Sequence, residues 1–131
     1  MERRAVITGL GMVTPLGIGK AENWRNLVSG KSGVVQMDSL RAKETSVAIG
    51  GAIENFKASD FIKDRKAIKL SFRNVHLAIA AAQLAVEDAG IKNGDIDPSR
   101  FGCFIGSGGG GYDDGPGFSD LTEPLLQSWS E

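Results

Sequence analysis

The chain has 131 residues, of which 41% are hydrophobic, 7% aromatic and 24% charged. This composition is that of an ordinary globular protein and argues against intrinsic disorder. The 15 Lys and Arg residues and 16 Asp and Glu residues give a net charge of −1, so no overall field favours nucleic acid or an anionic membrane. A single cysteine excludes an internal disulfide and a cysteine-rich metal site, and it suits a reducing cytoplasm. No apolar run reaches the roughly 18 residues that a membrane-spanning helix needs.

Glycine is the one unusual feature of the composition. It occurs 18 times in 131 residues, against a typical usage of roughly 7%. Eight of the 18 lie between Gly102 and Gly117, with neither a collagen period nor a linker composition. Such clusters indicate backbone turns of specific shape.

The first half of the chain predicts a strand, a turn and a helix. Residues 5–8 form a short β-branched run that ends at the glycines of residues 9–11, as expected of a buried strand before a tight turn. An amphipathic helix of about ten residues follows, with Gly30 at its C-terminal end. Its apolar positions are Ala21, Trp24, Leu27 and Val28. Extended segments are expected on either side of residues 50–51, followed by a short turn capped by Ser59.

The clearest predicted element is a long helix over residues 65–89. Its apolar residues recur at spacings of four and three, with Asp64 as the N-cap and Gly90 just beyond the C-terminus. These apolar residues are Ile68, Phe72, Val75, Ile79, Ala82, Val86 and Ala89. A second buried strand, residues 101–105, then enters the glycine-rich run 106–111. The order strand, helix, helix, strand predicts an α/β fold with a largely parallel sheet.

The glycine-rich run offers a nucleotide-binding alternative. Gly106, Gly108 and Gly111 match the G-x-G-x-x-G pattern that follows a strand in dinucleotide-binding domains. That pattern requires a helix that begins on the glycines and points its N-terminal amides at a pyrophosphate. Residues 113–117, Asp-Asp-Gly-Pro-Gly, make a poor and acidic helix start. A nucleotide site is therefore disfavoured.

Two single residues have both a catalytic and a structural interpretation. Cys103 lies within the second predicted strand, which favours a small buried hydrophobe over a nucleophile. His76 is the only histidine, so a multi-histidine site is excluded, and a solvated surface residue is expected. No cofactor and no metal ion are predicted.

Basic side chains line one side of the long predicted helix. They follow at spacings of three and four, at Lys66, Lys69, Arg73 and His76. One interpretation is a solvated face relieved by Asp60 and Asp64, and the other is a docking surface for an acidic partner. Spacing alone favours the solvated face and leaves docking open.

These segments together resemble the β-ketoacyl-acyl-carrier-protein synthases, most closely the elongating type II fatty-acid synthases and the related polyketide ketosynthases. The opening of the chain carries a clear likeness, with Arg-Ala-Val-Ile-Thr-Gly-Leu-Gly-Met-Val-Thr-Pro-Leu-Gly at residues 4–17. The resemblance runs in family order over residues 3–112. Its further stretches are residues 24–33, 56–66, 80–90 and 100–111.

The resemblance implies a thiolase-like α/β fold, in which two fused halves each hold a mixed sheet between helices. Residues 1–131 are then an incomplete N-terminal portion of the synthase domain, within its first half. The family transfers an acyl chain to a cysteine and condenses it with malonyl-acyl carrier protein, losing carbon dioxide, while two histidines stabilise charge. The family's Thr-Ala-Cys turn does not occur here. No catalytic residue is therefore expected in this chain, and the chain alone is expected to be inactive.

The resemblance also assigns roles to residues of this chain. Arg65, Lys66 and Lys69 match the family surface that receives acyl carrier protein, so docking becomes the favoured interpretation. Gly108, Gly109 and Tyr112 fall at the wall of the acyl pocket, where Gly109 takes the place of a bulkier side chain. The resemblance further implies a cytoplasmic homodimer that uses acyl and malonyl thioesters, without nucleic acid or membrane.

A second functional class stays open within the same resemblance. The chain could belong to a catalytically inactive partner subunit, like the chain-length factors of ketosynthase heterodimers. A cysteine in a Thr-Ala-Cys turn and two later histidines would indicate the enzyme, whereas a replaced cysteine would indicate the partner subunit.

Overall fold

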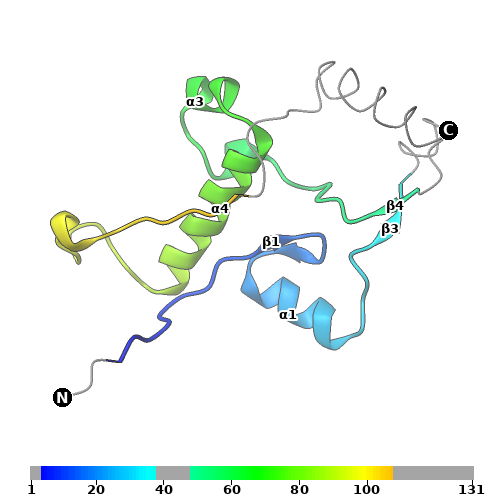
Figure 1. Cartoon of the computed structure of the whole chain (residues 1–131), viewed down its shortest axis with the longest axis horizontal. Coiled ribbons are helices and arrows are strands. Elements are labelled where there is room, and N and C mark those ends of the chain that lie inside the picture. The colour runs from blue at the N-terminus through cyan, green and yellow to red at the C-terminus, as the bar shows by residue number, and fades with distance from the viewer. Residues whose placement is uncertain (1–3, 38–47, 108–131) are drawn as a thin grey trace, which may run out of the picture.

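The computed structural model of the chain describes residues 4–37 and 48–107 (Figure 1). Short strands precede the first helix, and the longest helix lies in the second half. In chain order the elements are β1 (Val13–Thr14), β2 (Gly17–Ile18), α1 (Lys20–Val28), β3 (Val35–Gln36), β4 (Ile49–Gly50), the 3-10 turn η1 (Ala58–Asp60), α3 (Arg65–Leu70), α4 (Arg73–Asp88) and the 3-10 turn η2 (Pro98–Arg100).

The strands form two antiparallel pairs. β1 and β2 make a tight hairpin in which Val13 lies opposite Ile18. β3 pairs with β4, so that Val35 lies opposite Gly50. The expected extended segment before residues 50–51 is therefore present, but its partner is β3 rather than the residues that follow. Within the described ranges the pairing is antiparallel, which differs from the largely parallel sheet that the element order predicts.

The two predicted buried strands are not strands in this structure. Neither residues 5–8 nor residues 101–105 join a ladder within the described part of the chain, and both are exposed. Val6 is 79% exposed, Ile7 82% and Phe104 98%. The structure differs from the prediction because a β-branched run becomes a buried strand only when neighbouring strands pair with its backbone and cover its faces.

Helix α1 confirms the predicted amphipathic helix and its end. Gly30 has φ +72°, the left-handed conformation that favours glycine after a helix. Its N–H donates to the carbonyl of Leu27 at 3.0 Å, and the N–H of Lys31 donates to the carbonyl of Asn26 at 3.0 Å. These two bonds are the Schellman pattern, which satisfies carbonyls that the helix itself leaves unpaired.

The long helix predicted over residues 65–89 is divided into α3 and α4. Both expected ends are confirmed, since the Asp64 carboxylate accepts from the Lys66 N–H at 2.8 Å and Gly90 has φ +68°. Between the two helices, Ser71 and Phe72 are extended, with ψ of 156° and 162°. The Ser71 hydroxyl donates to the carbonyl of Ala67 at 2.6 Å. Serine competes with the helical backbone in this way, which the apolar spacing does not reveal.

Helix α4 contributes the fully buried residue of the core and contacts the segment before β1. Ala80 is fully buried, and residues 9–11 lie directly against the helix backbone. A Cβ added to Gly11 would lie 2.6 Å from the Ala85 nitrogen, and one added to Gly9 would lie 2.6 Å from the Ala89 nitrogen. The two glycines are therefore required for close approach of two backbones rather than for a turn.

Candidate functional site

Helix α3 carries three exposed cations on one side. Arg65, Lys66 and Lys69 are separated by one, three and four positions, which places them within about a third of the helix circumference. None of the three takes part in an ion pair within residues 4–37 and 48–107, and no acidic residue lies in the helix. We call these three residues the α3 basic patch. Its unpaired positive charges suit an acidic partner.

The nearby carboxylates do not neutralise the patch. Asp64 is held as the helix cap by the Lys66 backbone N–H, and Asp60 lies in η1 before it. Neither forms an ion pair with a residue of the patch in the described structure. The first interpretation of the sequence was a solvated face on which Asp60 and Asp64 offset the positive charges. The structure differs, because among the described residues neither aspartate is paired with a residue of the patch.

The other two basic residues of the predicted stripe face elsewhere. Arg73 donates to the carbonyl of Ile53, and its guanidinium lies 5.6 Å from the centre of the buried Phe56 ring. The expectation of a solvated His76 was wrong. Its side chain is half-buried, with Nε2 2.9 Å from the Ser71 Oγ. The break between α3 and α4 explains this difference, because it removes the continuous helix face on which the stripe depended.

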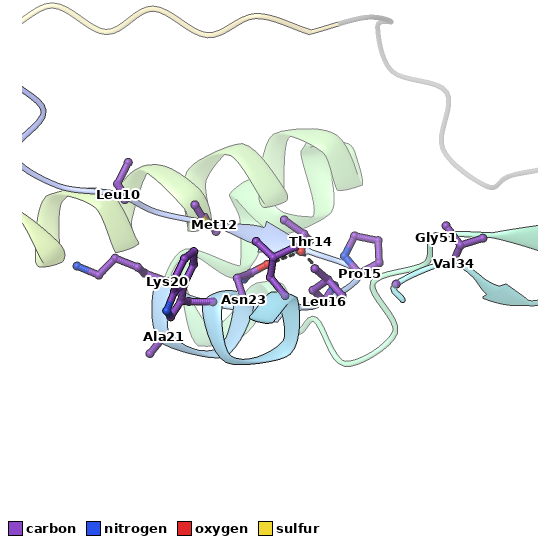
Figure 2. A pocket seen from close by; sticks show the side chains of 13 residues that line it. Leu10, Met12, Thr14, Pro15, Leu16, Lys20, Ala21, Asn23, Val34 and Gly51 are labelled. Carbon is purple, nitrogen blue, oxygen red and sulfur yellow. Dashed lines mark hydrogen bonds between the residues drawn. The ribbon is translucent and has the colours of Figure 1, made fainter. Parts of the chain in front are cut away.

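An open apolar groove lies between the β1–β2 hairpin and α1 (Figure 2). Its volume is about 770 Å³. Trp24 and Leu27 line it although they are 65% and 58% exposed. The other apolar side chains that line it are Leu10, Met12, Pro15, Leu16, Ala21 and Val34.

The polar residues of the groove are already occupied. Asn23 is only 5% exposed; its amide donates to the carbonyls of Gly17 at 2.9 Å and Gly19 at 2.8 Å, and its oxygen accepts from the Thr14 hydroxyl, as the dashed line in Figure 2 shows. These bonds fasten the hairpin to α1. The groove therefore presents an apolar binding surface and no paired nucleophile and base among its lining residues.

Asp88 joins three segments at the end of α4. Its carboxylate forms an ion pair with Lys20 and accepts from the Leu10 N–H at 2.9 Å. The hydrogen bond from Lys20 and the bond from the Leu10 N–H hold the pKa of Asp88 below its ordinary value. The cluster fastens the extended segment before β1 to both α1 and α4. Neither this cluster nor Asn23 was predicted. The partners of Asp88 lie 78 and 68 positions away, a separation that carries no periodic signal.

The remaining residues singled out in the sequence are Cys103 and the predicted wall of the acyl pocket. Cys103 is exposed rather than buried, because the strand in which it was expected does not form. Gly108, Gly109 and Tyr112, the predicted wall of an acyl pocket, lie outside the described residues.

The described residues contain neither a membrane-spanning helix nor a cluster of metal ligands. Across residues 4–37 and 48–107, no helix has the length and apolar character needed to cross a bilayer. In those ranges no three His, Cys, Asp or Glu side chains gather as a metal site would require.

Comparison with known proteins gives one consistent family. Residues 2–126 match the family described as "Beta-ketoacyl synthase, N-terminal domain". A 3-oxoacyl-acyl-carrier-protein synthase 2 from Synechocystis is 34% identical over 110 residues, which are 84% of this chain and 26% of the relative. One of the same name from Staphylococcus aureus is 35% identical over 111 residues, 85% of this chain and 27% of the relative. The chain thus spans about a quarter of the length of these relatives.

A solved structure agrees with the sequence relatives. The crystal structure of a beta-ketoacyl synthase from Burkholderia phymatum superimposes with a TM-score of 0.57 and 29% identity. The match covers 69% of this chain and 22% of that chain. This likeness is consistent with a thiolase-like fold.

Proposed function

Because the chain belongs to the β-ketoacyl synthase family, matching its N-terminal domain, we propose that it is the carrier-protein-docking portion of a 3-oxoacyl-acyl-carrier-protein synthase. The names of the relatives support this assignment. The observation that carries the docking role is the α3 basic patch, three exposed cations without an ion-pair partner in the described structure.

The proposed reaction belongs to the whole synthase and serves fatty acid or polyketide synthesis. An acyl group is transferred from a thioester to a cysteine sulfur, and the carrier thiol leaves. Malonyl-carrier protein then loses carbon dioxide, and the resulting enolate carbon attacks the acyl carbonyl and releases the cysteine. We place this cysteine and the two charge-stabilising histidines on parts of the synthase other than these 131 residues.

The docking role follows from charge and exposure. Acyl carrier protein presents an acidic helix in the family that this chain resembles. Positive residues at a contact rim raise the association rate and select the partner, and both effects weaken with salt. The α3 basic patch supplies such a rim, whereas Lys20 is already paired with Asp88.

The exposed apolar segments support a larger fold around this portion. We propose that residues 5–8 and 101–105 become strands of the mixed sheet of the first thiolase-like half, and that the rest of the same synthase covers the groove beside α1. Their exposure and the quarter-length match to the relatives support this. A cytoplasmic homodimer is proposed with it.

The acyl-pocket assignment is also a proposal. Gly109 would leave room for longer or branched acyl chains, with Gly108 and Tyr112 beside it. A Gly109→Phe variant of the full-length synthase should lose turnover of long acyl chains while it retains turnover of short ones. Undiminished turnover of long chains would contradict this assignment.

Charge reversal in the α3 basic patch tests the docking role. In the full-length synthase, Lys66→Glu with Lys69→Glu should raise the KM for malonyl-carrier protein about tenfold at low salt, because two favourable charge contacts become repulsive. The matched control is Lys31→Glu with Lys92→Glu, which changes the net charge equally at two other exposed lysines.

The outcome separates the docking surface from overall charge. An unchanged KM in the α3 variant at low salt contradicts the proposal, and so does an equal rise in both variants. If the unmodified full-length protein binds carrier protein but does not catalyse condensation, the chain belongs instead to the inactive partner subunit.

A further inference from the structure

The junction between α3 and α4 is held by a histidine whose proton position can be assigned. His76 Nε2 lies 2.9 Å from the Ser71 Oγ and 3.2 Å from the carbonyl oxygen of Ile68. The side chain of His76 begins in the first turn of α4 and reaches back to the last turn of α3. Figure 1 shows α3 adjoining the beginning of α4.

Hydrogen-bond chemistry fixes Nε2 as the donor in both contacts. The carbonyl of Ile68 can only accept. The Ser71 hydroxyl has one proton, and it donates that proton to the carbonyl of Ala67 at 2.6 Å. Its oxygen must therefore accept from His76, so Nε2 carries a hydrogen that both oxygens share.

These bonds complete the C-terminal end of α3 from outside the helix. Ala67 and Ile68 are among the last four residues of α3, whose carbonyls have no partner within the helix. Ser71 satisfies one of these carbonyls and His76 the other. A helix of six residues is far below the length of roughly 12 at which an isolated helix persists in water. The position of α3 therefore depends on such contacts.

A second set of contacts holds the beginning of α4. Arg73, the first residue of α4, lies against the Phe56 ring, and Phe56 stacks on Phe61 at 5.7 Å. Phe56 is buried, whereas the α3 basic patch on the neighbouring helix is exposed. The junction thus fixes where the three exposed cations of the α3 basic patch lie relative to the rest of the molecule.

From this geometry we propose that His76 is a positioning residue for carrier-protein docking: its Nε2–H fastens α3 to α4 and so holds the α3 basic patch in the orientation that a carrier protein meets. This proposal rests on the proposed function. His76 touches neither substrate nor carrier, and it acts through α3. Its effect should therefore fall on the KM for the carrier-bound substrate and leave the chemical step unchanged.

The test compares two substitutions of His76 in the full-length synthase. His76→Leu removes the donor, whereas His76→Gln keeps an amide N–H at a similar reach. His76→Leu should raise the KM for malonyl-carrier protein about fivefold with kcat unchanged, since one hydrogen bond to the junction is lost. His76→Gln should restore the KM to within twofold. Acyl transfer from a small carrier-free thioester should be equal in all three proteins.

A combination with the charge-reversed patch shows whether His76 acts through α3. In the Lys66→Glu, Lys69→Glu background, His76→Leu should raise the KM no further, because only Arg65 of the three cations remains and the patch is no longer positive. A further fivefold rise would overturn the proposal. A matching loss with the carrier-free thioester would overturn it too, since His76 would then support the whole fold.

The outcomes also separate this proposal from the proposed function. If charge reversal raises the KM and His76→Leu does not, the positioning role is wrong and the docking role stands. If charge reversal leaves the KM unchanged, the docking role is wrong, and the positioning role loses its basis.

Discussion

The segment from residue 9 to Gly30 and the segment 101–107 both contain apolar residues between glycines, yet only the first is packed and hydrogen-bonded. The first contains a hairpin and α1, whose ends are set by local bonds. The second has exposed apolar side chains such as Phe104. Turns and caps need only neighbours in sequence, whereas a strand needs partner strands that the described residues do not supply to segment 101–107.

The packed region is held together by a small number of contacts between its elements. Gly9 and Gly11 lie against the backbone of α4, Asn23 joins the hairpin to α1, and Asp88 joins α4 to Lys20. Each of these contacts can be removed singly in the 131-residue chain. The exposed segment 101–107 supplies a reference in which equivalent changes should have little effect.

The largest effect is expected at Gly11. Gly11→Val would force a side chain into the backbone of α4 near Ala85, and overpacking of this kind costs about 3 kcal/mol. The free energy of unfolding, followed by helical circular dichroism in urea, should fall by that amount. Gly106→Ala is the matched control, because a Cβ there meets open space. Its cost should stay below about 0.5 kcal/mol. Equal losses at the two glycines would remove the distinction between the regions.

A smaller loss is expected at Asn23. Asn23→Ala removes the side-chain amide that donates to the carbonyls of Gly17 and Gly19 at a buried site, which should cost about 2 kcal/mol. The exposed Asn55 is the control, where alanine should change the free energy of unfolding by less than about 0.5 kcal/mol. A neutral Asn23→Ala substitution would mean that the hairpin is not fastened to α1 by this side chain.

The smallest effect is a pH dependence at Asp88. Its pKa is lowered from 3.8 by the hydrogen bonds from Lys20 and Leu10, so the carboxylate stabilises the fold above the unfolded pKa. That contribution is lost as the pH falls below about 3.8, through the folded-state pKa. Unfolding measured from pH 6 to pH 2 should show this loss, and Asp88→Asn should flatten it. An unchanged pH profile in Asp88→Asn would contradict the role of the ion pair.

Asp97 provides a comparison for the pH dependence at Asp88. Its pKa is also lowered, by hydrogen bonds from Ser99, but the contact spans only two residues. Protonation of Asp97 should loosen η2 alone, whereas protonation of Asp88 should release residue 10 from α4. Amide exchange at Leu10 distinguishes the two, because only Asp88 accepts from that N–H.

What could be predicted from the sequence follows the same division. Glycine at the ends of α1 and α4 and Asp64 before α3 are local signals, and all three mark real helix ends. The break at Ser71 was missed because the apolar spacing continues through it. Residues 5–8 and 101–105 have strand composition, but composition does not show whether a partner strand is present.

The candidate site shows the same limit. The three residues of the α3 basic patch were named from the resemblance to the family, whereas spacing alone grouped Lys66 and Lys69 with Arg73 and His76. Arg73 and His76 were assigned to the same stripe, and the structure turns both toward the junction instead. Their partners, Ile53 and Ile68, lie 20 and eight residues away, and no spacing rule links a side chain to such a carbonyl.

Amide hydrogen exchange of the full-length synthase, with and without acyl carrier protein, tests the docking role most directly. Helix α3 is short and exposed, so its amides should exchange rapidly in the free protein. Carrier protein at low salt should slow exchange at residues 65–70 and leave residues 20–28 unchanged, and salt should reverse the protection. Equal exchange at residues 65–70 with saturating carrier protein would contradict the account.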